Sequence, residues 1–153
     1  MDRKVYIGCD NAAVALKHEL TRFISGMGYT VVDAGVESAD DETVYPDVAR
    51  GVAEKIIQSE YKDYGVLVCG TGIGMAISAN KFKGIRAAVC HDNFSAERAR
   101  LSNDANVLCL GARVIGPELA KKIVEEWLSL EFVDGSSTPK VQAIQKLEAM
   151  NFK

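Results

Sequence analysis

Short, β-branched apolar segments alternate with helical segments along the whole chain, and this alternation restricts the possible folds more than any other feature. Five segments have the length and composition of buried strands, at residues 4–9, 30–34, 64–69, 85–90 and 107–110. The segments between and after them place apolar residues at helical spacing. Strands that alternate with helices lie parallel and are joined by right-handed crossovers. We therefore predict a doubly wound, Rossmann-like αβα sandwich with a five-stranded parallel sheet and a C-terminal helix.

The expected helix boundaries follow from apolar spacing, prolines and polar caps. Apolar residues from Leu16 to Met27 recur at the spacing of a first helix. Three later helices each have a proline suited to their first turn, at positions 46, 117 and 139. Ser95 is a candidate N-cap for a short helix after the fourth strand.

Composition excludes several classes of protein. The 153 residues are 48% hydrophobic and 25% charged, as in ordinary globular proteins, and suffice for one substantial core. With no repeat or linker in the sequence, residues 1–153 are expected to form a single domain. The net charge of −3 argues against nucleic acid binding. No apolar run has the length of a membrane span and the first residues are not those of a signal peptide, so we expect a cytoplasmic protein without membrane contact.

The four cysteines, at positions 9, 69, 90 and 109, each lie at or near the end of a predicted strand. They are widely spaced and form no C-x-x-C pair, so we predict neither a metal site nor a disulfide framework. Three of them are interpreted as small core residues in a reducing compartment.

Polar and glycine-rich segments follow three of the predicted strands. Asp10 and Asn11 follow the first strand, residues 70–74 the third, and His91 the fourth. Ligands of doubly wound sheets bind beyond the carboxyl ends of the strands. These segments are therefore expected to meet around one site.

The strongest chemical signal is the segment Cys69-Gly70-Thr71-Gly72-Ile73-Gly74. A buried strand ends in a thiol, and three glycines then open a helix. Glycines let the backbone approach a ligand closely, and the N–H groups at a helix start favour negative charge. We expect the same field to favour the thiolate form of Cys69. A base beside an anion-stabilising loop is what proton abstraction next to a carbonyl requires.

Two other interpretations of this loop compete with the catalytic one. A dinucleotide-binding fingerprint would need glycine where Met75 stands, and it would follow the first strand instead of the third. A structural turn between strand and helix, with an inert Cys69, fits the local sequence equally well.

Three single residues also have two interpretations each. Asp10 could orient a substrate hydroxyl or cap the first helix, and the cap is the better local prediction. His91 could be an acid or base, or a histidine of a surface loop. Arg113 follows the fifth strand on the side of the glycine loop, so it could meet a phosphate, although a surface ion pair would also explain it.

Taken together, the motifs resemble the type B ribose-5-phosphate isomerase family, which also includes the galactose-6-phosphate isomerase subunits. The matching segments cover nearly the whole chain in family order: IGCD at 7–10, YPD at 45–47, CGTGIG at 69–74, SANK at 78–81, GIRA at 84–87, NDAN at 103–106 and GARVIG at 111–116.

The resemblance implies an aldose–ketose isomerase of a small phosphorylated sugar that uses no metal or other cofactor and forms a cis-enediolate. Cys69 matches the base that moves a proton between carbons 1 and 2. The loop with Gly70, Gly72 and Gly74 matches the anion hole of the family. Asp10, Thr71 and Tyr45 match residues that line the sugar site of the family. Asp10 and Thr71 are predicted to be catalytic together with Cys69.

The resemblance also implies an assembly. Family members are dimers or dimers of dimers with the active site at the subunit interface. Asn103 and Arg113 would accordingly be contributed by the neighbouring chain.

Three positions depart from the family pattern. Asn11 stands where the family usually has a histidine, and Ser102 replaces the histidine that opens the furanose ring. In the C-terminal phosphate-binding segment, residues 135–140, only Lys140 has a positive charge, and a lysine does not replace a bidentate guanidinium. We retain Asn11, His91 and Lys140 as predicted substrate ligands.

Three hypotheses about function follow. The first is an isomerase of the ribose 5-phosphate type, in which His91 or a water replaces the lost histidine. The second is an isomerase of a tetrose 4-phosphate, which cannot close a furanose and needs no ring-opening acid; residues 90–103 resemble a branch that includes tetrulose-phosphate isomerases. The third is a non-catalytic sugar-phosphate-binding regulator, against which the retained Cys69 argues.

Overall fold

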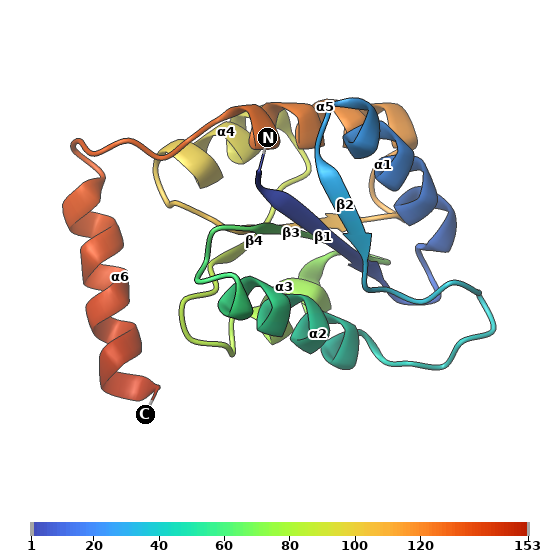
Figure 1. Cartoon of the computed structure of the whole chain (residues 1–153), viewed down its shortest axis with the longest axis horizontal. Helices are drawn as coiled ribbons and strands as arrows, with labels where there is room; N and C mark the ends of the chain where they lie inside the picture. The colour runs from blue at the N-terminus through green and yellow to red at the C-terminus, as the bar shows by residue number, and fades with distance from the viewer. Residues whose placement is uncertain (1, 153) are drawn as a thin grey trace.

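The computed structural model describes residues 2–152 and shows three layers, with a parallel sheet between two layers of helices (Figure 1). The strands are β1 (Lys4–Cys9), β2 (Thr30–Asp33), β3 (Tyr64–Cys69), β4 (Ala87–Val89) and β5 (Val107–Gly111). The helices in this part of the chain are α1 (Val14–Gly26), α2 (Tyr45–Gln58), α3 (Ile73–Ala79), α4 (Asn93–Leu101), α5 (Pro117–Ser129) and α6 (Thr138–Asn151). The predicted fold class is confirmed.

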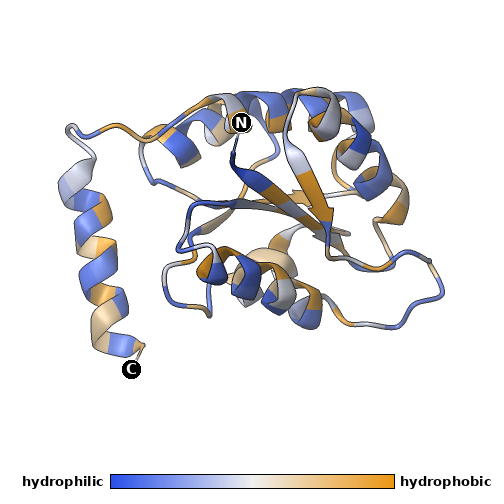
Figure 2. Ribbon diagram, in the orientation of Figure 1, coloured by the Kyte–Doolittle hydropathy of each residue, from blue (hydrophilic) through white to orange (hydrophobic). Residues whose placement is uncertain are grey.

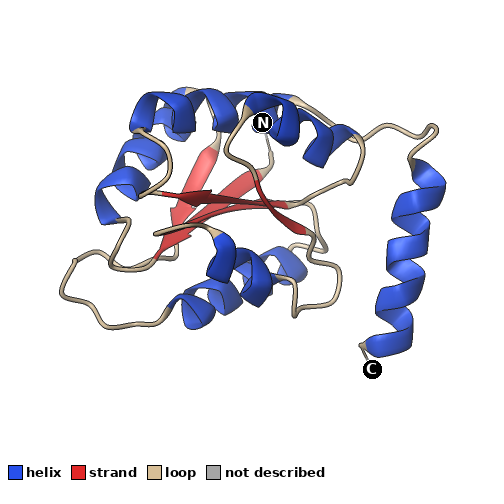
Figure 3. Ribbon diagram, turned by 180° about the vertical axis from the view of Figure 1, so that it is seen from behind, coloured by secondary structure: helices blue, strands red, loops and turns tan. Residues whose placement is uncertain are grey.

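The sheet has the order β2-β1-β3-β5-β4. Helices α2 and α3 cover one face and α1, α4 and α5 cover the other, as the two opposite views show (Figures 1 and 3). The chain moves outward from β1 to β2 and then returns to the other side of β1 for β3. Ligands of doubly wound sheets bind at such a switch point, because the connections leave the two strand ends in opposite directions.

The core is densest around β3 and β5, where every residue is buried. Both faces of these central strands are covered, which explains their continuous apolar runs. Helix α2 approaches β3 closely: a methyl group on Gly65 would lie 2.7 Å from Val52 Cγ1. Helix α6 stands away from the sandwich and leaves Ile144, Leu147 and Met150 exposed.

Two predicted strands are shorter than expected. The second ends at Asp33, and the fourth contains only Ala87–Val89. The backbone N–H of Ile85 donates to Phe82 O at 3.1 Å, and that of Arg86 to Asn106 Oδ1 at 2.8 Å. These donors are used in a turn and by a side chain, and the pairing of β4 with β5 begins at Ala87, opposite Val107.

Two predicted helix caps are wrong. Helix α4 is capped by Asp92, whose Oδ1 accepts the N–H of Ser95 at 2.7 Å, so Ser95 lies inside the first turn. Helix α1 begins three residues after the expected place, with Ala13 as its N-cap. The Asp10 carboxylate instead accepts the Ala12 N–H at 3.0 Å within the preceding turn. The proline-based helix starts are confirmed for α2, α5 and α6.

Within residues 2–152, no helix combines the length and the apolar composition needed to cross a membrane.

Candidate active site

Asp10 and Cys69 meet at the switch point of the sheet. Strands β1 and β3 are neighbours, with Cys9 paired to Val68. The next residue, Asp10, donates its backbone N–H to Val68 O at 3.3 Å. The first predicted polar segment and the predicted base therefore lie side by side at the carboxyl edge.

The thiol of Cys69 is enclosed by the glycine loop. Cys69 is 5% exposed, and its Sγ accepts a hydrogen bond from the backbone N–H of Gly72 at 3.1 Å. Gly72 has a φ of +79°, a conformation that favours glycine and that turns the loop back toward the sulfur. A methyl group at this position would lie 3.0 Å from the Leu110 carbonyl carbon. Both the backbone conformation and the close packing therefore require glycine here.

Tyr45 packs against the glycine loop, and Thr71 is part of it. Tyr45 is the first residue of α2, and its ring lies so close to Gly74 that a side chain there would overlap it. Thr71 is exposed, and its Oγ1 accepts the Ile73 N–H at 3.3 Å. The predicted sugar-lining residues are therefore gathered around Cys69.

Arg113 reaches the glycine loop of its own chain. The backbone N–H of Arg113 donates to Gly70 O at 3.0 Å, and that of Ala112 to Cys69 O at 2.8 Å. A methyl group on Gly70 would lie 3.3 Å from a guanidinium nitrogen of Arg113. The end of β5 therefore places Arg113 beside the glycine loop of its own chain, and the contribution of an Arg113 from a neighbouring chain stays a prediction.

Asn11 ties two loops together. Its Nδ2 donates to Asp41 O at 2.9 Å, which joins the segment after β1 to the loop between β2 and α2. Asn11 is exposed beside Asp10, and this hydrogen bond fixes the direction of its side chain.

Lys17 is a contributor to this edge that the sequence analysis missed. Its buried Nζ donates to Val36 O at 2.6 Å and lies 2.8 Å from Asp33 and 2.9 Å from Glu37. Burial lowers the pKa of Lys17, but the two carboxylates outweigh this effect and the net pKa is raised. A lysine next to Leu16, on the apolar side of a predicted helix, could have indicated a buried ion pair.

His18 completes a group with Asp33 and Glu37 that has the spacing of metal ligands. The His18 Nε2 lies 3.1 Å from Glu37 Oε2. The Lys17 ammonium already contacts both carboxylates, and its positive charge disfavours a cation there. The donor set therefore does not fit a metal ion.

His91 lies at the carboxyl edge, where its Nε2 accepts the backbone N–H of Gly111 at 2.9 Å. Gly111 is paired with Cys69 in the ladder between β3 and β5. His91 is half-buried in the loop between β4 and α4, and this hydrogen bond ties its ring to the end of β5.

Asn103, Ser102 and Lys140 are not brought to this site within one chain. Asn103 and Ser102 precede β5 and therefore lie at the amino edge of the sheet, whereas Cys69 lies at the carboxyl edge. Lys140 is exposed in the first turn of α6, the helix opposite the β2–α2 loop in Figure 1. Asn103 lines a cavity between the sheet and α6 together with Ile144 and Leu147.

The other three cysteines differ from Cys69 in their surroundings. Burial raises the pKa of Cys9 and of Cys90 to about 11, and it also raises the pKa of the fully enclosed Cys109 well above its usual value. They are inert core thiols at neutral pH, as predicted for three of the four.

A nearly buried thiol that accepts a loop N–H, next to a carboxylate and an arginine, is suited to moving a proton beside a carbonyl and stabilising the resulting anion. This arrangement, at the carboxyl edge of a doubly wound sheet, fits an aldose–ketose isomerase. Residues 5–144 match the family model described as Ribose/Galactose Isomerase, and the chain belongs to this family. Its reaction is the isomerisation of a small phosphorylated sugar.

Known relatives cover almost the whole chain. D-erythrulose-4-phosphate isomerase from Pectobacterium atrosepticum is 51% identical over 92% of this chain and 91% of its own. Ribose-5-phosphate isomerase B from Escherichia coli is 44% identical over 95% and 97%. The crystal structure of ribose-5-phosphate isomerase B from Mycoplasma genitalium with bound ribulose-5-phosphate superposes with a TM-score of 0.93, at 34% identity over 97% and 98% of the two chains. Membership of an isomerase family argues against the non-catalytic regulator.

Proposed function

We propose that Cys69 is the base of this isomerase. Its thiolate removes the proton from carbon 2 of the aldose, and the C–H electron pair moves into the carbonyl group to give a cis-enediolate. The same sulfur returns the proton to carbon 1, while the hydroxyl proton on the oxygen of carbon 2 passes to the oxygen of carbon 1, which gives the ketose without loss or gain of atoms. The observation that supports this role is the hydrogen bond from Gly72 N–H to Cys69 Sγ, because such a donor stabilises a negative sulfur.

The glycine loop and its neighbours are assigned to the anion and the sugar. Residues 70–74 offer backbone N–H groups to the enediolate oxygens, and Thr71 adds a hydroxyl. Asp10 is assigned to accept a hydrogen bond from a sugar hydroxyl. Arg113, exposed beside Gly70, is suited to a phosphate because a guanidinium can donate two parallel hydrogen bonds.

The preferred substrate is proposed to be a tetrose 4-phosphate. A pentose 5-phosphate is mainly a closed furanose, and its ring oxygen must be protonated before carbon 2 can react. His91 Nε2 is already used as an acceptor for Gly111 N–H, which leaves a neutral ring that is a far weaker acid than an imidazolium. The chain's other histidine, His18, lies on α1 and contacts Glu37. Neither histidine is thus available as the ring-opening acid.

The second candidate substrate is ribose 5-phosphate, because the Escherichia coli relative is a ribose-5-phosphate isomerase B. We expect the wild-type kcat/KM to be larger for D-erythrose 4-phosphate than for ribose 5-phosphate. Ser102→His should raise the ribose 5-phosphate activity by about tenfold or more, within the usual contribution of a general acid, and change the tetrose activity little. A wild-type preference for ribose 5-phosphate that Ser102→His does not increase would contradict the tetrose assignment.

A homodimer, alone or paired as a dimer of dimers, is proposed to complete the site. Asn103 and Lys140 lie far from Cys69 in one chain, so a second copy would have to supply them. Apolar side chains remain exposed on two helices in positions suited to such contact: Ile73 and Ile77 on α3, and Ile144, Leu147 and Met150 on α6. Figure 2 shows apolar and polar bands alternating along α6.

The dimer is tested by mixing two defective variants. Cys69→Ala and Asn103→Ala each damage a different half of a shared site, so random exchange of subunits should restore about a quarter of the wild-type sites. Light scattering on the wild-type chain should give at least twice the monomer mass. A monomer that is fully active, or a mixture without recovered activity, would contradict shared sites.

A further inference from the structure

The hydrogen bond between His91 and Gly111 determines the state of the imidazole ring. A backbone N–H can only donate, so the Nε2 atom that it reaches at 2.9 Å must hold a lone pair. The proton of the neutral ring is therefore on Nδ1. His91 is fixed as a neutral acceptor, which is the opposite of what proton donation through Nε2 would need.

Gly111 is the point where β5 supports the glycine loop. A methyl group on Gly111 would lie 2.7 Å from Thr71 Cα, so the two backbones are in close contact. Gly111 is also the ladder partner of Cys69. A shift of Gly111 would consequently be transmitted to the base and to the hydroxyl of Thr71.

The residues after Gly111 continue this support. Ala112 donates its N–H to Cys69 O at 2.8 Å, and Arg113 donates to Gly70 O at 3.0 Å. His91 comes from a different part of the chain, the segment between β4 and α4, and its side chain holds the start of this turn through the hydrogen bond with Gly111. Its position in the chain next to Asp92, the cap of α4, restrains the His91 backbone.

We propose that His91 is a positioning residue that holds the end of β5 beneath the glycine loop and thereby sets the geometry of Cys69 and Thr71. It acts through Gly111 as a neutral hydrogen-bond acceptor and transfers no proton. The inference rests on the proposed roles of Cys69 and the glycine loop.

The tautomer of His91 is read first, without substrate. The chain has two histidines, so long-range ¹H–¹⁵N spectra of the histidine-labelled protein give two rings that His18→Gln separates. We expect His91 as the Nδ1–H tautomer, with an unprotonated Nε2. An Nε2–H tautomer, or a Gly111 amide signal that does not move in His91→Ala, would overturn the proposal.

The functional test compares two substitutions at the same position. In His91→Gln the side-chain oxygen reaches the place of Nε2 and accepts the Gly111 N–H, but an amide cannot transfer protons; His91→Ala removes the acceptor. We expect His91→Gln to keep kcat within about threefold of wild type and His91→Ala to lose about tenfold or more, since a small misplacement of a reacting group can reduce a rate 10²-fold. His18→Gln is the matched control and should remain at the wild-type rate.

Two outcomes of the comparison would overturn the proposal. If His91→Gln is as slow as His91→Ala while both are folded, the histidine transfers a proton. If His91→Ala retains the wild-type kcat, the hydrogen bond between His91 and Gly111 has no effect on the site. Failure of the Cys69 assignment would show separately, as an active Cys69→Ala, and would leave the tautomer and the Gly111 amide signal unchanged.

Discussion

Two arginines, one at each edge of the sheet, are placed in contrasting ways. Arg100, at the end of α4, has a side chain that is 1% exposed; it donates to Tyr64 Oη and Ala105 O and lies 3.3 Å from an Asp104 carboxylate oxygen. Arg113, after β5, is exposed against the backbone of Gly70. The buried arginine has its hydrogen bonds made within the fold, whereas the exposed one is accessible to an anion.

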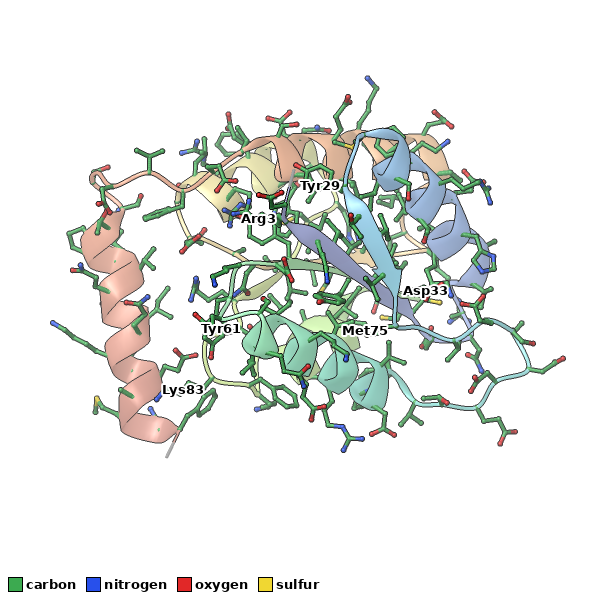
Figure 4. The ribbon with its side chains drawn as sticks, in the orientation of Figure 1. Arg3, Tyr29, Asp33, Tyr61, Met75 and Lys83 are labelled. Atoms are coloured by element: carbon green, nitrogen blue, oxygen red, sulfur yellow. The ribbon has the colours of Figure 1, made fainter. Side chains whose placement is uncertain are left out.

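The same difference extends to the two edges as a whole. At the amino edge, Arg3 and Arg100 lie over the Tyr64 ring at 4.0 and 4.5 Å, and Glu131 pairs with both arginines. Figure 4 labels Arg3 and Tyr29 at this edge and Asp33 at the carboxyl end of β2. The carboxyl edge instead has glycines, a thiol, short polar side chains and the exposed Arg113 around the glycine loop, with the ion pairs of Lys17 beside the end of β2. One edge is therefore organised for stability and the other for a ligand, a contrast that substitutions can test.

The largest expected effect is on activity at the carboxyl edge. Cys69→Ala should reduce kcat by about 10²- to 10⁴-fold, the usual contribution of a general base. Because the side chain is small and lies at the end of a strand, the thermal unfolding temperature should stay near that of wild type. Cys109→Ala is the control, with activity retained. Near-normal turnover by folded Cys69→Ala would refute its assignment as the base.

The next effect is on stability at the amino edge. Arg100→Ala removes a buried cation that serves two acceptors and two carboxylates, so the free energy of unfolding should fall by about 3 kcal/mol. Urea unfolding measures this change. The kcat of the folded fraction should be nearly unchanged, and a large loss of kcat without loss of stability would break the contrast between the edges.

A smaller effect is expected at the second arginine. Arg113→Ala should raise the KM for a sugar phosphate by about tenfold or more, since a hydrogen bond to a charged group contributes about 1.5–3 kcal/mol. Stability should change little because the side chain is exposed. Arg113→Lys should recover only part of the affinity, as a point charge lacks the guanidinium geometry. An unchanged KM would place the phosphate elsewhere.

The smallest effect concerns the order of thiol labelling. A raised pKa means that the thiolate appears only at higher pH, so at pH 8 about one in 10³ molecules has an ionised Cys9 or Cys90, with their pKa values near 11. Iodoacetamide should therefore modify Cys69 first, and substrate should protect it. For Cys9 and Cys90 the labelling rate should rise about tenfold per pH unit up to their pKa. Peptide mass spectrometry that finds Cys9 or Cys109 modified first would contradict this order.

Much of the carboxyl edge could be predicted from local sequence. Short β-branched apolar runs identified the strands, apolar residues at helical spacing identified the helices, and the succession of these elements implied a parallel sheet. Because parallel strands share one carboxyl edge, Asp10, Cys69 and His91 were expected near each other before their contacts were known. Glycines 70, 72 and 74 likewise indicated close backbone approach.

Tertiary structure alone decided which of these residues touch. The contact of Arg113 with Gly70 in the same chain, the hydrogen bond from Gly111 to His91, and the burial of Lys17 against Asp33 all join segments distant in sequence. Local patterns state which face of an element is buried, but strand order and register determine its neighbours. The helix caps could not be predicted from local sequence either, although Asp10 and Ser95 are both good capping residues. A turn after Asp10 delays the start of α1 to Val14, and α4 is capped by Asp92 instead of Ser95.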